Sequence, residues 1–157
     1  RAALQALALQ LGADVPVFVF GRPAFAEGVG EILHPVAVPP AWYVVLTPPV
    51  HVPTASVFAA PELTRDTPPL KIAPFSAGMG HNDLEPVVVK RHPEVARHLA
   101  WLARFGEARM TGSGACVFAS FDTEDAAHDV LRLLPESMRG FVAQGLDRHP
   151  LYDFCAG

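Results

Sequence analysis

The chain has 157 residues, half of them hydrophobic and 18% charged, so it can build a core and does not have the composition of a disordered protein. Its net charge of −4, without a Lys/Arg cluster, argues against a nucleic-acid-binding surface. No apolar run approaches the roughly 20 residues of a membrane span, which argues against a membrane protein. Two isolated cysteines, Cys116 and Cys155, favour free thiols in a reducing, cytoplasmic setting over a disulfide framework.

The chain begins with a predicted helix that is followed by a short apolar run. Residues 2–10 are rich in Ala, Leu and Gln, which are strong helix formers. Gly12 is expected to end this helix in the left-handed conformation that glycine adopts without steric cost. Pro16 is expected to keep Val15 out of the helical region, so residues 17–20 are predicted to form a short buried strand.

An acid falls at this predicted helix-to-strand corner, because Asp14 lies between the helix and the apolar run. A carboxylate with apolar chain on both sides is either well hydrogen-bonded or functional, since burying a bare charge is costly. The alternative is an Asx-type turn, in which the side chain bonds its own backbone. By itself, the spacing favours the turn.

The rest of the chain alternates predicted strands and helices, separated by glycine and proline signals. The predicted strands are residues 24–27, 31–35, 42–46, 108–110, 116–121 and 140–144. The predicted helices are residues 53–60, a segment opening at residue 82, and residues 93–105 and 124–134. Residues 65–81 are predicted to form a loop with a short helical piece at 70–75. This order predicts an α+β fold with helices packed on one face of an antiparallel sheet.

Two polar segments of this pattern are candidates for chemistry. Asn82 and Glu85 have the spacing of a capping box at a helix start, which accounts for both residues and excludes them from the candidate site. Residues 111–115 form a glycine-rich turn, which is either a plain connection between two strands or a loop whose amide N–H groups approach a phosphate. The scattered histidines lack the spacing of a zinc site, so no metal ligands are predicted.

Six segments, in order along nearly the whole chain, carry a likeness to a known family: residues 11–18, 24–31, 52–54, 82–86, 109–118 and 140–143. Together they resemble the GHMP kinase superfamily, and within it the branch that phosphorylates a CDP-linked methylerythritol in non-mevalonate isoprenoid synthesis. The resemblance implies that residues 1–36 are the end of an amino-terminal domain. Residues 37–157 would form a carboxy-terminal α/β sandwich with an antiparallel sheet.

The resemblance also implies roles for particular residues. It assigns to Asp14 the catalytic carboxylate that receives the proton of the attacking alcohol or positions that alcohol. It assigns substrate binding to Thr54 and to Phe58, whose ring would stack on cytosine. The residues implied to form an active-site loop are Thr111, Gly112, Ser113 and Gly114. Within the family pattern, Pro49 stands in place of a glycine and His51 in place of a serine-like residue.

The resemblance implies ATP and Mg²⁺ as cofactors, a CDP-methylerythritol as the small-molecule substrate, and neither nucleic acid nor membrane as a partner. The sequence lacks the glycine- and serine-rich phosphate loop of the family. We therefore expect it to be a carboxy-terminal portion that needs a missing amino-terminal part and does not phosphorylate the substrate alone. The alternatives are a non-catalytic α+β binding or regulatory module, and a GHMP kinase for homoserine, mevalonate or galactose.

Overall fold

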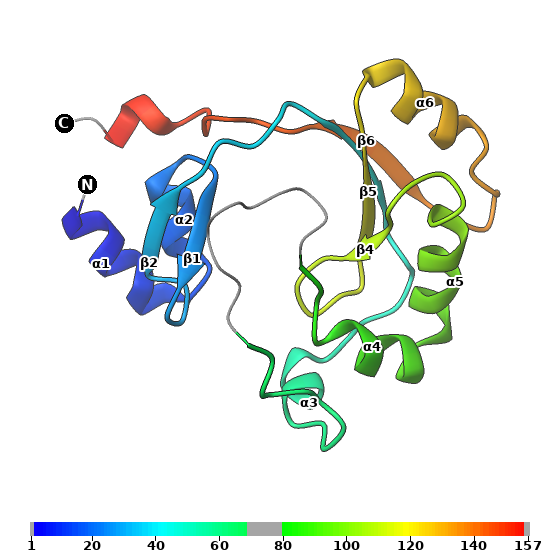
Figure 1. The fold of residues 1–157 in the computed structure, drawn as a ribbon, viewed down its shortest axis with the longest axis horizontal. Coiled ribbons are helices and arrows are strands. Elements are labelled where there is room, and N and C mark those ends of the chain that lie inside the picture. Colours follow the sequence, from blue (N-terminus) through cyan, green and yellow to red (C-terminus); the bar gives the residue numbers. More distant parts are fainter. Residues whose placement is uncertain (1, 69–79, 156–157) are drawn as a thin grey trace. The chain divides into compact units, whose positions relative to one another are not determined.

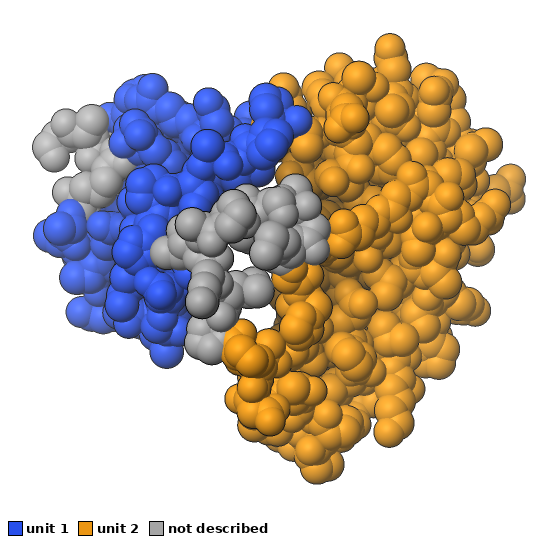
Figure 2. All heavy atoms as spheres, viewed as in Figure 1, with its two compact units in different colours: residues 1–40, 146–157 blue, residues 41–145 orange. Residues whose placement is uncertain are grey.

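The structure, a computed structural model, describes residues 2–68 and 80–155. The chain forms two compact units (Figure 2). Unit 1 consists of residues 1–40 and 146–157, and unit 2 of residues 41–145. The helical piece predicted at residues 70–75 lies outside the described residues.

Unit 1 contains two helices, a hairpin and a short 3-10 turn (Figure 1). Helix α1 (Ala2–Leu11) is the predicted helix of strong helix formers, and it packs against α2 (Val15–Phe20). Strands β1 (Ala24–Glu27) and β2 (Ile32–Pro35) pair antiparallel, which confirms the predicted hairpin. The 3-10 turn η1 (Tyr152–Cys155) contacts α2.

Helix α2 corrects the strand predicted at residues 17–20. A short apolar run fits a strand and a helix turn equally well by its pattern, and here Pro16 lies in the first helical turn, where its missing N–H removes no hydrogen bond. Val15 is accordingly helical. The left-handed stop is also displaced, because Gly21 has φ +71° and closes α2, whereas φ is not positive at Gly12.

Unit 2 is built on a four-stranded sheet in the order β4-β5-β3-β6, in which every pair is antiparallel. Its strands are β3 (Trp42–Leu46), β4 (Arg109–Met110), β5 (Val117–Phe121) and β6 (Gly140–Gln144). Strand β3 lies between β5 and β6, and its Val44 and Leu46 are fully buried. Strand β4 lies at one edge of the sheet, so one side of its backbone is left for partners outside the sheet.

Helices α5 (Pro93–Leu102) and α6 (Glu124–Arg132) pack on the same side of this sheet (Figure 1). Thr123 caps α6, because its hydroxyl accepts the Ala126 N–H. The two shorter helices are α3 (Thr54–Phe58) and α4 (Glu85–Arg91), which packs against α5. The buried core is rich in valine, with contributions from the sheet and from α3, α4, α5 and α6. The predicted α+β architecture, with helices on one face of an antiparallel sheet, is confirmed.

Candidate active site

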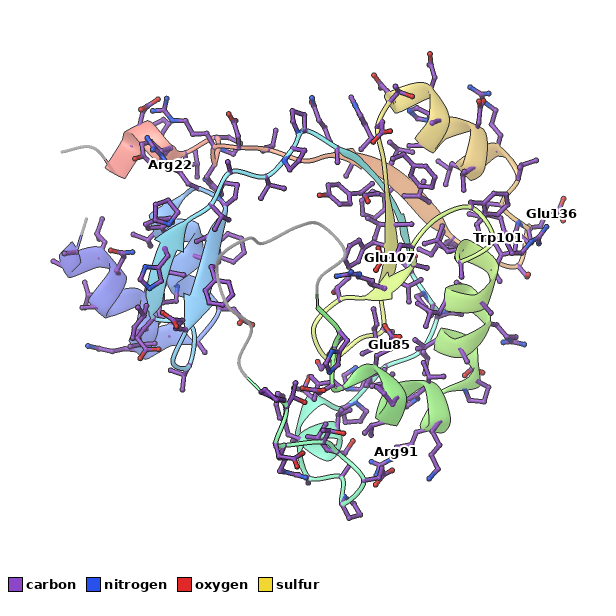
Figure 3. The ribbon with its side chains drawn as sticks, in the orientation of Figure 1. Arg22, Glu85, Arg91, Trp101, Glu107 and Glu136 are labelled. Carbon is purple, nitrogen blue, oxygen red and sulfur yellow. The ribbon has the colours of Figure 1, made fainter. Side chains whose placement is uncertain are left out.

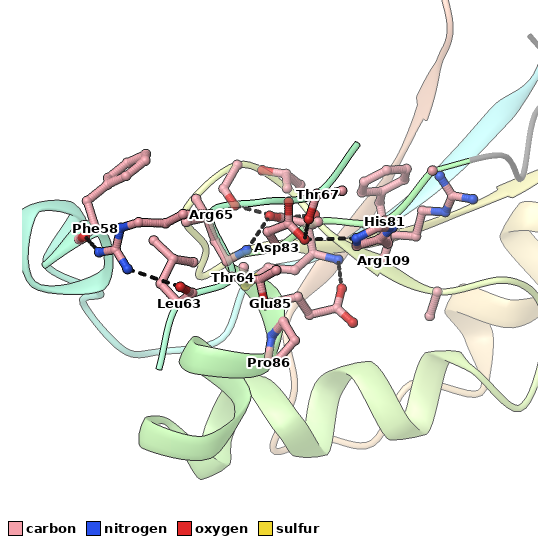
Figure 4. Close-up of a pocket in the computed structure, with 18 of the residues that line it drawn as sticks. Phe58, Leu63, Thr64, Arg65, Thr67, His81, Asp83, Glu85, Pro86 and Arg109 are labelled. Carbon is pink, nitrogen blue, oxygen red and sulfur yellow. Dashed lines mark hydrogen bonds and ion pairs between the residues drawn. The ribbon is translucent and has the colours of Figure 1, made fainter. Parts of the chain in front are cut away.

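A pocket of about 1130 Å³ opens in unit 2 beside the edge strand β4 (Figure 4). Its walls come from three segments: the end of α3 with the chain that follows it, the residues that lead into α4, and β4 with the turn after it. Residues from all three segments are polar, and the lining also contains the aromatic rings of Phe58 and Phe118. The pocket therefore combines a stacking surface with hydrogen-bonding groups, as small-molecule sites do.

The turn between β4 and β5 forms one wall of this pocket, and we call residues 111–114 the glycine loop. The Thr111 N–H donates to the Cys116 carbonyl at 2.9 Å, and the Gly114 N–H donates to the Thr111 carbonyl at 2.8 Å. The loop is thus a tight strand connection. Thr111 and Gly112 also line the pocket, so the approach of their N–H groups to a phosphate stays a prediction.

The two glycines of the loop are required for different reasons. Both have left-handed backbone conformations, with φ +47° at Gly112 and +86° at Gly114. A Cβ on Gly114 would lie 3.0 Å from the Met110 sulfur and 3.5 Å from a Val88 methyl, so this position is also tightly packed. A Cβ on Gly112 would meet nothing within 4 Å, so the backbone there stands in open space.

Thr54, a predicted substrate-binding residue, contacts Ser113 of the glycine loop, although neither residue lines this pocket. The Thr54 and Ser113 hydroxyl oxygens are 2.7 Å apart, although the residues are 59 positions apart in the chain. Thr54 is the first residue of α3, so this hydrogen bond joins the start of α3 to the glycine loop. The predicted substrate helix and the predicted active-site loop therefore lie side by side.

Phe58 lines the pocket from the last position of α3, and its side chain is 56% exposed. It is therefore not an ordinary core residue, and its ring is available for stacking. Arg65 holds this end of the helix, because its guanidinium donates to the Phe58 carbonyl at 2.6 Å and also to the carbonyls of Ala60 and Leu63 (Figure 4). Sequence reasoning missed Arg65, since a lone basic residue in a loop gives no sign of which carbonyls it will reach.

Asn82 and Glu85 do not form the predicted capping box. Helix α4 begins at Glu85, and the Asn82 Oδ1 accepts the Leu84 N–H at 3.0 Å in a local turn. The Asn82 Nδ2 instead donates to the Met110 carbonyl at 3.1 Å and to the Gly112 carbonyl at 2.7 Å. The Glu85 Oε2 accepts the Met110 N–H at 2.9 Å (Figure 4). Both residues line the pocket, which makes them candidates for a role there.

The remaining polar groups of the pocket are mostly paired with one another. Asp83 accepts hydrogen bonds from the Thr67 hydroxyl at 2.9 Å and, when His81 donates, from its ring at 2.8 Å. The Arg109 guanidinium is bound to Glu107. These pairs fix the pocket wall between the chain after α3 and strand β4.

Arg91 of α4 is bonded both to α3 and to the chain that follows α3. Arg91 donates to the Glu62 carboxylate at 2.9 Å and to the Ser56 carbonyl at 3.1 Å (Figure 3). The pKa of Glu62 is lowered, first by a hydrogen bond from its own backbone N–H and then by the hydrogen bond and charge of Arg91. The helix that carries Thr54 and Phe58 is thereby anchored at its far side.

Asp14 belongs to unit 1, where it is the N-cap residue of α2 with φ −84° and ψ −11°. It therefore lies between two helices and not at the predicted helix-to-strand corner. Its side chain is exposed, and among the described residues its carboxylate has no hydrogen-bond partner, so the Asx-type turn is not formed. A carboxylate in this condition is free to accept a proton or a ligand hydroxyl.

Neither a cluster of metal ligands nor a membrane-spanning helix occurs within residues 2–68 and 80–155. No three or more His, Cys, Asp or Glu side chains there lie close enough to hold a metal ion. Nor does any helix in that part of the chain have the length and apolar character needed to cross a membrane.

Comparison with known proteins shows which proteins this chain resembles. Residues 69–140 match the family described as "GHMP kinases C terminal". A 4-diphosphocytidyl-2-C-methyl-D-erythritol kinase of Thiobacillus denitrificans is 80% identical over 154 residues, which cover 98% of this chain and 55% of that protein. The kinase of the same name from Nitrosospira multiformis is 65% identical over 157 residues, with 53% of its length covered. The chain thus spans about half the length of the curated relatives it matches.

A solved structure gives the same result for the fold. The crystal structure of a 4-(cytidine 5'-diphospho)-2C-methyl-D-erythritol kinase matches with a TM-score of 0.75 at 34% identity. The match covers 90% of this chain and 56% of the other chain. It includes parts of both units, because 90% of the chain exceeds either unit alone.

Proposed function

We propose that the chain is the carboxy-terminal portion of a 4-diphosphocytidyl-2-C-methyl-D-erythritol kinase, because residues 69–140 match the carboxy-terminal family of the GHMP kinases and nearly the whole chain resembles kinases of that name. The full-length protein would transfer the γ-phosphoryl group of ATP to the 2-hydroxyl of 4-diphosphocytidyl-2-C-methyl-D-erythritol. The observation that carries this proposal is the 80% identity over 98% of the chain.

Asp14 receives the role of the carboxylate at the attacking alcohol. As the substrate oxygen forms its bond to the γ-phosphorus, the bond to the ADP oxygen breaks and the hydroxyl proton passes to Asp14. The exposed carboxylate, unpaired among the described residues, supports this role. A carboxylate already held in a salt bridge would be a weaker acceptor.

The pocket of unit 2 receives the substrate. Phe58 presents a half-exposed ring on which the cytosine base stacks, and stacking of this kind is worth about 1–3 kcal/mol per base. Thr54 binds a polar group of the substrate, and its hydroxyl is held by Ser113. The glycine loop lines the site beside them, with Thr111 and Gly112 at the pocket wall.

ATP and Mg²⁺ are the co-reactant and cofactor of the proposed full-length enzyme. Among residues 2–68 and 80–155, no group of His, Cys, Asp or Glu side chains could hold a metal ion. We propose that the binding elements for both lie mostly in an amino-terminal part, and that residues 1–36 are the end of that domain. A cytoplasmic location follows from the proposed use of ATP.

Helix α1 supplies the surface on which that amino-terminal part would dock. Leu4, Leu7 and Leu11 follow one another at helical spacing, and their side chains are 44%, 57% and 81% exposed. A stripe of exposed leucines marks an interaction surface. The unmatched half of the relatives is the partner we propose for it.

The test compares the full-length protein with the 157-residue chain in an assay that contains ATP, Mg²⁺ and the cytidine-linked substrate. We expect phosphorylated product from the full-length protein only. Robust turnover by the chain alone would refute the division of the site between two parts. Absence of turnover by the full-length protein would favour the alternative of a non-catalytic module.

A further inference from the structure

The edge strand β4 and the glycine loop are held by two side chains from the segment that leads into α4. Among the described residues, strand β4 pairs with β5 alone, so the outward backbone groups of Met110 need other partners. The Glu85 carboxylate accepts a hydrogen bond from the Met110 N–H, and the Asn82 amide donates one to the Met110 carbonyl. The two side chains thus replace the neighbouring strand that this edge lacks.

The same contacts extend into the loop itself. The Asn82 amide also binds the Gly112 carbonyl at 2.7 Å, while the Thr111 carbonyl is taken by the Gly114 N–H. All three consecutive carbonyls from Met110 to Gly112 are therefore occupied. In contrast, the N–H groups of Gly112 and Ser113 have no partner among the described residues.

This division of hydrogen bonds gives the loop a polarity. The three carbonyl oxygens already accept hydrogen bonds, so the N–H groups of Gly112 and Ser113 are the backbone groups that stay available there. Successive free N–H groups form a concave donor site for an anion or an oxygen. An asparagine is suited to the task, because one amide nitrogen donates to two carbonyls while the amide oxygen accepts the Leu84 N–H.

We propose that Asn82 and Glu85 are positioning residues, which hold the glycine loop in the conformation that leaves the Gly112 and Ser113 N–H groups available to the reacting ligands. The proposal rests on the kinase function proposed above. It assigns no contact between Asn82 or Glu85 and the substrate. Their effect passes through the loop, and through Ser113 to Thr54 at the start of α3.

Steady-state kinetics of the full-length enzyme test the proposal with paired variants. Asn82→Asp keeps the acceptor for Leu84 but sets a carboxylate oxygen against two carbonyl oxygens. Glu85→Ala removes the acceptor for the Met110 N–H, whereas Glu85→Gln retains one in its amide oxygen. We expect kcat to fall about 100-fold in the first two variants, with a smaller change in KM for the cytidine substrate, because misplacement by about 1 Å costs that much. Glu85→Gln should stay within about threefold of wild type, since it restores the hydrogen bond.

Glu136→Ala is the matched control, since Glu136 is an exposed glutamate of the same unit that lies near the end of α6, away from Glu85 (Figure 3). Amide hydrogen exchange of the peptide around Met110 adds a readout without activity, and protection there should be lost in Glu85→Ala and kept in Glu85→Gln. Wild-type kcat in Asn82→Asp and Glu85→Ala would overturn the proposal while leaving the kinase function intact. A purely structural role would lower the folded fraction but leave kcat per folded enzyme unchanged, which also overturns it. An inactive wild-type enzyme would instead refute the proposed function, and the positioning role with it.

Discussion

Replacement of Asp14 by asparagine separates catalysis from stability in this account. The side chain is exposed and its carboxylate makes no cap hydrogen bond to α2. Asparagine and aspartate are equally good at a helix N-cap, and the loss of one charge at an exposed helix start is worth at most about 0.3–1 kcal/mol. We therefore expect Asp14→Asn to change the free energy of unfolding by about 1 kcal/mol or less.

The expected effect on catalysis is much larger. Acceptance of a proton by a positioned side chain contributes about 100- to 10,000-fold to a rate, which corresponds to about 3–5 kcal/mol of barrier. The amide of asparagine can still position the alcohol but cannot take its proton at neutral pH. In the full-length enzyme, Asp14→Asn should lower kcat by this factor with little change in KM for either substrate.

Asp147→Asn is the control, because Asp147 is also an exposed aspartate of unit 1 and has no partner among the described residues. Thermal unfolding and steady-state kinetics should be measured on both variants. If Asp14→Asn kept kcat within tenfold of wild type, the assignment of the proton acceptor would be wrong. If it unfolded the protein, the inference that this carboxylate is structurally free would be wrong.

Three further predictions follow from contacts in unit 2. Gly114→Ala should destabilise the protein by about 1–3 kcal/mol in chemical denaturation, because it combines a left-handed backbone with a Cβ 3.0 Å from a buried methionine sulfur; an unchanged midpoint would contradict this. Thr54→Val and Ser113→Ala should show a coupling of about 0.5–1.5 kcal/mol in a double-mutant cycle of unfolding free energies, and purely additive effects would dismiss the hydrogen bond between them. The lowered pKa of Glu62 means that its contribution to stability is present above its unfolded pKa and is lost as pH falls through its folded pKa. In an NMR titration Arg91→Met should raise this pKa, and no shift would argue against the ion pair.

Much of the fold could be predicted because local signals mark it. Alanines, leucines and glutamines predict α1, and glycine and proline signals separate the strands and helices that follow. Helix α2 was missed because six apolar residues do not distinguish a strand from a short helix. The deciding features are the place of Pro16 in the first turn and the left-handed Gly21, which the pattern of apolar residues does not reveal.

The candidate site was predicted from resemblance to a known family, and local patterns contributed little to it. Thr54, Phe58 and the glycine loop were identified from resemblance. In the structure Thr54 contacts Ser113, and Phe58, Thr111 and Gly112 line one pocket, while their roles stay predictions. Asn82 and Glu85 were predicted to form a capping box because their spacing fits one, whereas their side chains bind the backbone of β4 and the glycine loop. Which backbone a side chain reaches 25 or more residues away depends on the tertiary fold, and no local pattern encodes it.

The measurement that tests the central claim most directly is the substrate preference of the full-length protein. With ATP and Mg²⁺ present, kcat/KM should be compared for 4-diphosphocytidyl-2-C-methyl-D-erythritol, homoserine, mevalonate and galactose. We expect turnover of the cytidine-linked substrate, with ³¹P NMR showing the product's new phosphate on its 2-hydroxyl. We expect little or no turnover of the other three alcohols. A preference for one of the other alcohols, or no phosphoryl transfer to any of them, would contradict it.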